Sequence, residues 1–197
     1  MIAIIDYGAG NIQSVKNALD FLKVKNKITD KAEDILKADK VIFPGVGAFG
    51  DVMKVLKTKK LIDPIKKVIK EKPYLGICLG LQVLFEKSEE SPGIKGLGIF
   101  KGNVKKFSSK TLKIPQIGWN SIMINKKNPI LNNIKDNSYF YFVHSYYVDP
   151  KDKSIILTKT NYGQEFVSGI AKDNIIGIQF HPERSGEVGL QLLKNFI

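Results

Sequence analysis

The sequence predicts an α/β fold with a central, mainly parallel sheet flanked by helices and extended by additional antiparallel strands. In the first half of the chain, short apolar segments alternate with amphipathic ones, the pattern of a parallel sheet covered on both faces. After Pro92 the segments become β-rich and are separated by Gly and Asn turns. The length of 197 residues, 43% of them apolar, suits a single domain over residues 1–197.

Each element follows from a local pattern. Apolar strands are predicted at residues 2–5, 41–43 and 74–77. Helices with apolar residues on one face are predicted at residues 12–22, 64–69, 79–87 and 187–196. Asp63-Pro64 is a typical start signal for the second helix. The second half is predicted to be mostly strand, at residues 98–107, 121–124, 139–148, 154–160, 166–171 and 175–180.

Composition limits the classes of function. The net charge of +12 would favour a polyanion partner, but every cation except Arg184 is a lysine, and the lysines are scattered without an aromatic platform. A solvated surface is therefore the preferred interpretation, and no nucleic-acid partner is expected. Arg184, as the only arginine, indicates a place that needs a planar fork of donors.

Other patterns bear on the location of the protein. No apolar run approaches the roughly 20 residues of a membrane span, and Met1 leads directly into a predicted strand rather than a basic leader. Cys78 is the only cysteine, so no internal disulfide can form. We expect a soluble cytoplasmic protein that contacts no membrane.

The segment Gly76-Ile77-Cys78-Leu79-Gly80 lies between a predicted strand and a predicted helix. Gly-x-Cys-x-Gly at such a junction is typical of a nucleophile elbow, because the strained turn exposes the nucleophile and the glycines remove Cβ atoms that would clash. At a helix N-terminus the sulfur would also lie near the positive end of the helix dipole. The alternative is a lone cysteine packed as a small apolar residue.

A thiolate nucleophile needs a base, and the base needs a group that orients it. His181 follows the last predicted strand, Pro182 stiffens the turn, and Glu183 can accept a hydrogen bond from the imidazole. The predicted triad is Cys78, His181 and Glu183. The other histidine, His144, lies in an aromatic strand with no carboxylate nearby in sequence, and a structural or substrate-edge role is favoured for it.

Acyl transfer also needs donors for the developing oxyanion. The backbone N–H of Leu79 directly follows the nucleophile, and Val46 and Gly47 lie in a glycine-rich loop after a predicted strand. A phosphate-binding loop is the alternative, but no Walker lysine with serine or threonine follows, and the dinucleotide spacing is absent. No metal or cofactor is therefore expected.

These residues resemble the triad-type, class I glutamine amidotransferases and, among them, the glutaminase subunits of imidazole glycerol phosphate synthases. The resemblance covers essentially the whole chain. Gly-x-Cys-x-Gly alone is only moderately specific, whereas the blocks in this order are highly specific. The blocks that carry it are Asp6-Tyr7-Gly8-Ala9-Gly10-Asn11, Pro44-Gly45-Val46-Gly47-Ala48-Phe49-Gly50, Gly76-Ile77-Cys78-Leu79-Gly80-Leu81-Gln82, Leu84-Phe85-Glu86, Pro115 with Gly118-Trp119-Asn120, Tyr141-Phe142-Val143-His144-Ser145-Tyr146, and residues 179–189 around His181-Pro182-Glu183.

The resemblance implies a flavodoxin-like fold and a glutaminase that needs no cofactor. Its cysteine would form a glutamyl thioester, and the released ammonia would pass through a tunnel to a (β/α)8-barrel cyclase partner in a heterodimer of histidine biosynthesis, which yields imidazole glycerol phosphate and an aminoimidazole carboxamide ribonucleotide. It implies that the glutamine head group is held by Gln82, Glu90, Ser145 and Tyr146. It implies a partner interface that includes Asn11, Ser14, Trp119, Tyr141 and Arg184.

From sequence alone, plainer roles remain open for several of these residues. Trp119 and Tyr141 could be core aromatics, Glu90 a solvated loop charge, and Asn11 with Ser14 a helix cap.

The chain departs from the family pattern twice. Gln116-Ile117 stands where the family usually has His-Met, and Arg184 where it often has lysine. Both departures fall where the family communicates with its partner. A paralogous glutaminase feeding another acceptor, such as a sugar-amidinating ligase, is the alternative function. A self-sufficient cysteine peptidase or γ-glutamyl hydrolase and a basic nucleic-acid-binding module are the competing classes.

Overall fold

The computed structural model describes residues 1–8, 11–109 and 111–197. Ala9 and Gly10 of the first family block lie outside the described residues. A central sheet of eleven strands runs through the protein and confirms the predicted fold class. Its parallel part consists, in spatial order, of β2 (Asn26–Thr29), β1 (Ile2–Ile5), β3 (Lys40–Phe43), β4 (Tyr74–Ile77) and β13 (Ile175–Ile178).

The second half of the chain extends this sheet with antiparallel strands. They pair outward from β13 in the order β12 (Glu165–Lys172), β10 (Tyr146–Pro150) and β6 (Gly102–Lys106), and β5 (Lys87–Ser88) pairs parallel with β6. Two further strands, β11 (Ile156–Asn161) and β8 (Met123–Ile124), branch from β12. The sheet is therefore mixed, with its parallel strands in the N-terminal half and at β13.

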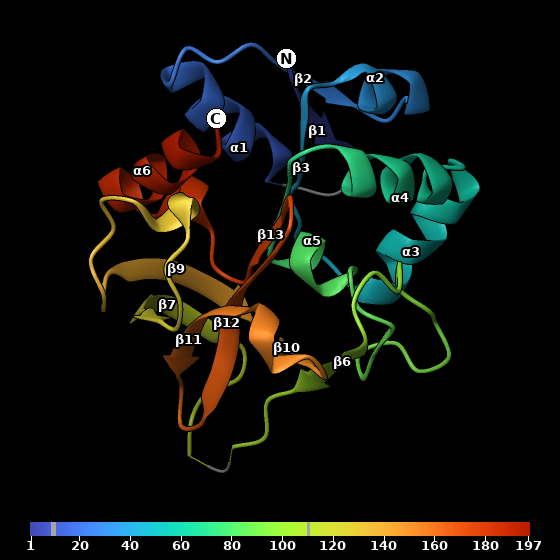
Figure 1. Cartoon of the computed structure of the whole chain (residues 1–197). Helices are drawn as coiled ribbons and strands as arrows, with labels where there is room; N and C mark the ends of the chain where they lie inside the picture. Colours follow the sequence, from blue (N-terminus) through green and yellow to red (C-terminus); the bar gives the residue numbers. More distant parts are fainter. Residues whose placement is uncertain (9–10, 110) are drawn as a thin grey trace.

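Helices cover both faces of the parallel strands (Figure 1). One face packs against α1 (Ile12–Phe21) and α6 (Gly186–Phe196). The other face packs against α2 (Ala32–Lys37), α3 (Phe49–Thr58) and α4 (Ile62–Glu71). Two separate clusters of buried apolar residues result, one on each side of the sheet, because the strands are buried on both faces.

A second, two-stranded sheet pairs β7 (Gln116–Ser121) with β9 (Tyr139–His144) in antiparallel register. Along β9, exposed or half-buried side chains alternate with buried ones, so Phe140, Phe142 and His144 point into the core. Short 3-10 helices complete the fold at η1 (Pro129–Leu131), η2 (Lys153–Ile155) and η3 (Pro182–Arg184). The last of these carries two of the predicted site residues.

Several predicted elements need correction. The strand predicted over residues 121–124 is interrupted, because β7 ends at Ser121 and β8 begins at Met123, and the strand predicted over residues 154–160 begins only at Ile156, after η2. The helix predicted over residues 79–87 is only α5 (Leu79–Gln82), because the chain then turns to form β5. The strand predicted over residues 139–148 breaks at Ser145, where the chain leaves β9 and enters β10 in the other sheet. The strand predicted over residues 98–107 begins only at Gly102.

In the part of the chain that the structure describes, no helix is both long enough and apolar enough to span a membrane.

Candidate active site

The predicted nucleophile lies at a sharp turn at the carboxyl end of β4. Cys78 has φ 52° and ψ −104°, in the left-handed half of backbone space that L residues rarely occupy. A Cβ at Gly76 would lie 2.4 Å from the Gly80 carbonyl oxygen, and a Cβ at Gly80 would lie 1.9 Å from that of Phe43. Both glycines are therefore required by close backbone approach, as the elbow interpretation assumes.

The helix behind the nucleophile is shorter than predicted. Because α5 has only four residues, its dipole is small, and it stabilises a thiolate less than the predicted longer helix would. A charge on the sulfur would therefore have to be stabilised mainly by side chains.

The three predicted triad residues meet beside the carboxyl ends of β4 and β13. Nδ1 of His181 lies 2.8 Å from Oε1 of Glu183, and both side chains are buried. Nε2 of His181 has no hydrogen-bond partner among the described residues. It nevertheless lies close enough to Cys78 for the charge on the sulfur to act on the imidazole. The sulfur and the imidazole are therefore neighbours, and the attraction between them is mainly electrostatic.

The imidazole of His181 is held in its charged form. Burial alone would lower its pKa, but the Cys78 thiolate and the Glu183 carboxylate outweigh burial and raise the pKa of His181 to about 10. A proton is therefore available on His181 for a leaving amine, and Glu183 at Nδ1 fixes the ring orientation.

The other histidine is in a different environment. Burial lowers the pKa of His144 to about 4, so the ring is neutral. Its Nδ1 lies 2.8 Å from the Tyr146 carbonyl oxygen and must carry the proton, since a carbonyl only accepts. Nε2 is then an acceptor, and Oε1 of the Gln116 amide lies 3.1 Å from it. Because two acceptors cannot bond to each other, we infer that the amide is rotated by a half-turn and donates from its NH₂ group.

Two of the three predicted oxyanion donors are engaged by protein acceptors. The N–H of Val46 donates to the Tyr7 hydroxyl at 3.0 Å, and the same hydroxyl donates to the Val46 carbonyl at 3.0 Å. The N–H of Leu79 points to the Gly45 carbonyl at 3.5 Å, a long contact. Gly47 has φ 113°, a conformation that glycine adopts without strain. A substrate oxygen would have to displace these internal acceptors.

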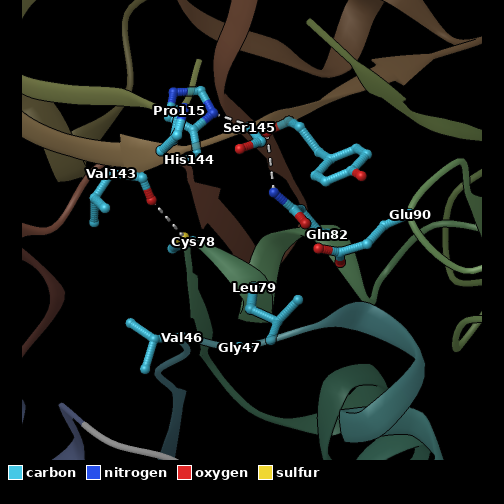
Figure 2. Close-up of a pocket in the computed structure, with 11 residues that line it drawn as sticks. Val46, Gly47, Cys78, Leu79, Gln82, Glu90, Pro115, Val143, His144 and Ser145 are labelled. Atoms are coloured by element: carbon cyan, nitrogen blue, oxygen red, sulfur yellow. Dashed lines mark hydrogen bonds between the residues drawn. The ribbon is translucent and has the colours of Figure 1, made fainter. Parts of the chain in front are cut away.

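Figure 2 shows the pocket beside the nucleophile, which has a volume of about 240 Å³. A pocket of this size suits a ligand as small as an amino acid. It is lined by Val46, Gly47, Cys78, Leu79, Gln82, Glu90, Pro115, Val143, His144, Ser145 and Tyr146. Every predicted oxyanion and substrate-binding residue is therefore at this pocket.

Two substrate-binding candidates are held by hydrogen bonds. Oε2 of Glu90 accepts from the backbone N–H of Phe49 at 2.7 Å, at the start of α3, so Glu90 is not the solvated loop charge of the plainer interpretation. Nε2 of Gln82 donates to the Tyr146 carbonyl and to Oε1 of Gln179, both at 3.1 Å. Both amide hydrogens of Gln82 are used, which leaves its oxygen as the atom that can accept from a ligand.

The residues predicted at a partner interface occupy one region of the surface. Trp119 is 56% exposed and contacts half-buried Tyr141 edge to face, so Trp119 is not a core aromatic. Next to it Ile117 is 59% exposed, whereas Gln116 is only 3% exposed and packs inward on His144. Of the two departures in this segment, only Ile117 faces the surface. Ser14 lies in a groove between α1 and η3.

Asn11 does not cap α1 with its side chain. Its Nδ2 donates to Oε1 of Glu183, and its Oδ1 accepts from Nε and Nη2 of Arg184 at 3.2 and 3.0 Å. The guanidinium of Arg184 thus donates two hydrogen bonds to Asn11, which also contacts the carboxylate of Glu183. The backbone carbonyl of Tyr141 accepts a hydrogen bond from the backbone N–H of His181 at 2.9 Å. Backbone and side-chain contacts therefore connect this surface to the site.

The sequence analysis gave no role to two residues beside the nucleophile. Tyr7 binds the predicted oxyanion loop, and Gln179 donates to the Cys78 sulfur at 3.3 Å. For Gln179 a signal was present, because it precedes His181 by two residues and the two-residue period of an extended segment places both on one side. For Tyr7 no such signal was present, because its contact with Val46 requires knowing that β1 and β3 are neighbours in the sheet.

Residues 3–197 match the family Glutamine amidotransferase class-I, and the chain belongs to this family. It is 53% identical to the imidazole glycerol phosphate synthase subunit HisH of Methanocaldococcus jannaschii, over 100% of this chain and 98% of that protein. It is 51% identical to subunit HisH of Pyrococcus furiosus, over 99% of this chain and 97% of that protein. Within the family, the chain groups with these HisH subunits.

Solved structures share the fold at low sequence identity. One described as a glutamine amidotransferase has a TM-score of 0.76 at 16% identity and covers 100% of this chain and 99% of its own. The structure of PurLQS from Thermotoga maritima has a TM-score of 0.79 at 20% identity, covering 99% of this chain and 96% of the matched chain.

Proposed function

We propose that this protein is the glutaminase subunit of an imidazole glycerol phosphate synthase. It hydrolyses glutamine to glutamate and ammonia, and it passes the ammonia to a (β/α)8-barrel cyclase subunit in histidine biosynthesis. Residues 1–197 act as one glutaminase domain, in the cytoplasm. The observation that carries the proposal is that His181, bonded to Glu183, acts on the sulfur of Cys78, which lines a small pocket, in a chain about half identical throughout to HisH subunits.

The chemistry follows from the charges at the site. The Cys78 thiolate attacks the carboxamide carbon of glutamine, and backbone N–H groups of Val46, Gly47 or Leu79 receive the oxyanion. The C–N bond breaks as His181 gives its proton to the leaving nitrogen, so ammonia departs and a glutamyl thioester remains. A water then loses its proton to His181 and attacks the thioester, which releases glutamate and the free sulfur.

Glutamine recognition uses the rest of the pocket. The carboxylate of Glu90 can accept from the substrate's ammonium group, and the free oxygen of Gln82 can accept from either substrate nitrogen. Ser145 and Tyr146, on the segment between the two sheets, close the opposite side. A negatively charged wall beside an amide-sized pocket favours an amino acid over a peptide backbone.

The partner is proposed to bind over the β7–β9 surface and the neighbouring start of α1. Support comes from the exposed side chains of Ile117, Trp119 and Tyr139, which form an apolar patch beside Tyr141. Exposed aromatic residues are enriched at protein interfaces. The contacts from Asn11 to Glu183, and from the Tyr141 carbonyl to His181, give a bound partner a direct route to the triad.

The test is a glutaminase assay with and without a barrel cyclase subunit and its phosphorylated ribulosyl substrate. Glutamate release by the unmodified protein should rise at least about tenfold in the complex, within the usual range of allosteric coupling. A Cys78→Ala variant should bind the cyclase equally well and release no glutamate. Equal rates with and without the cyclase, or an active Cys78→Ala protein, would rule the proposal out. The HisH relatives do not favour a sugar-amidinating acceptor enzyme as the partner. With such a partner, the cyclase subunit would leave the rate of glutamate release unchanged in the same assay.

A further inference from the structure

Gln179 makes a contact with the nucleophile that no step above uses. Its side chain is 0% exposed, and its Nε2 lies 3.3 Å from the Cys78 sulfur. We propose that Gln179 is a further catalytic residue, whose amide donates a hydrogen bond to the sulfur and stabilises the thiolate before substrate attack. The inference rests on Cys78 being the nucleophile of the proposed function.

The direction of this hydrogen bond is fixed by its neighbours. The Tyr146 carbonyl can only accept, so the Gln82 NH₂ group must face it, at 3.1 Å. The second hydrogen of that NH₂ group then donates to Oε1 of Gln179, also at 3.1 Å. With its oxygen used in this way, Gln179 must present its own NH₂ group to the sulfur. A backbone carbonyl thus orients a donor at Cys78 through two buried amides.

The sulfur has a second contact, of the opposite kind. Its thiol form can donate to the Val143 carbonyl, which lies 4.0 Å away (Figure 2), whereas its thiolate form can only accept. The Gln179 contact is shorter by 0.7 Å, from 4.0 and 3.3 Å. Because Cys78 is only 6% exposed, water contributes little to solvating the charge. The donor at Gln179 therefore favours the thiolate, and the one-turn helix α5 adds little.

The backbone holds Gln179 rigidly beside the base. Its N–H donates to the Ser168 carbonyl at 2.8 Å, and two residues on, the N–H of His181 donates to the Tyr141 carbonyl at 2.9 Å. The same extended segment thus presents a neutral donor and a charged imidazole to one sulfur atom. The donor is pre-organised and requires no rearrangement when the charge develops.

Several ionisable groups act on the sulfur or share its pocket, in addition to the neutral amide of Gln179. His181 lies beside it after β13, with Glu183 behind, and the Tyr7 hydroxyl approaches from the end of β1. His144 and Glu90 lie on the wall of the same pocket. An experiment on the sulfur must therefore change the Gln179 donor while leaving these groups in place.

The experiment measures the rate of iodoacetamide alkylation against pH in the full-length protein. Since Cys78 is the only cysteine, the label reports on this sulfur alone. Gln179→Met keeps the length and burial of the side chain but removes the donor, and we expect the midpoint of the rate profile to move to higher pH by about one unit, the effect of one hydrogen bond to a charged group.

Gln179→Glu provides a second test with the same shape. It keeps an acceptor for Gln82 but places a carboxylate oxygen against the sulfur, so the midpoint should move further than in Gln179→Met. This variant also serves if the methionine protein does not fold. Gln116→Met is the matched control, because it removes another buried amide that contacts His144 and not the sulfur. Its profile should match that of the unmodified protein.

Unchanged midpoints in folded Gln179→Met and Gln179→Glu would overturn the inference, and so would an equal shift in Gln116→Met. Failure of the proposed function is separate, because it would appear as absence of glutamine hydrolysis by the unmodified protein with its cyclase. The alkylation profiles would still report whether Gln179 acts on the sulfur.

Discussion

One buried histidine, His144, ends β9, and a second, His181, follows β13 by three residues. The two are held in opposite protonation states. His181 is 1% exposed and His144 is 6% exposed. Burial acts on both in the same direction, but two anionic neighbours raise the pKa of His181 to about 10, whereas His144, bonded to a carbonyl and an amide, falls to about 4. The comparison teaches that burial without anionic neighbours leaves an imidazole neutral, and that anionic neighbours are needed to keep a buried imidazole charged so that it can serve as an acid.

The test with the largest expected effect makes the same substitution, histidine to glutamine, at each of the two positions. His181→Gln removes the proton carrier, and glutamine hydrolysis should fall by at least about 10³-fold, the scale of losing a triad member. His144→Gln keeps an amide in a neutral position, and the fall should stay below about tenfold. Steady-state kinetics with the cyclase bound provide the measurement. Equal losses in the two variants would show that the protonation states do not separate their roles.

A second test removes the main anion beside His181. In Cys78→Ala only Glu183 remains to oppose burial, so the pKa of His181 should fall by at least about two units from its value of about 10. The His144 pKa should stay low, because burial is its main cause. Histidine C2 proton resonances followed through a pH titration give both values. A His181 pKa unchanged by the substitution would mean that the thiolate is not its cause.

The sequence alone predicted only part of this contrast, because one histidine is set by residues adjacent in sequence and the other by contacts distant in sequence. His181 could be assigned from Pro182 and Glu183, which are local. The neutral state of His144 comes mainly from its burial, and its contact with Gln116, 28 residues earlier, requires the register of β7 against β9. Local signals therefore predicted the role of His181 beside Glu183, whereas the neutral state of His144 follows only from the tertiary structure.

The fold divides in a similar way. Strongly apolar segments such as β1 and β4 were predicted within a residue of their bounds, because burial on both faces leaves an unmistakable pattern. The edge strand β2 has one buried residue in four, and its sequence gave no signal. The end of α5 at Gln82 and the break at Ser145 were also missed, because both are set by pairing with strands distant in sequence.

A third test uses acid to examine His144. A histidine whose pKa is lower in the folded state than its ordinary 6.5 binds a proton more readily when unfolded. The contribution of His144 to the free energy of unfolding should therefore be fully present above about pH 6.5 and should be lost as the pH drops toward about 4, by roughly 3 kcal/mol. Urea unfolding at several pH values measures this slope. In His144→Gln the slope between those pH values should decrease, and an unchanged slope would assign the acid sensitivity to other groups.

The smallest expected effect concerns the surface side of the triad carboxylate. Arg184→Lys keeps the charge but loses the two-pronged contact with Asn11, which itself binds Glu183. Because the pair is exposed, the free energy of unfolding should fall by less than about 1 kcal/mol, and the His181 titration should move only slightly, since Glu183 keeps its bond to Nδ1. Arg184→Met is the control for charge. If Arg184→Lys shifted the His181 pKa as much as Glu183→Gln does, the surface contact would be part of what charges the imidazole, and the contrast between the two histidines would originate at the exposed surface rather than inside the site.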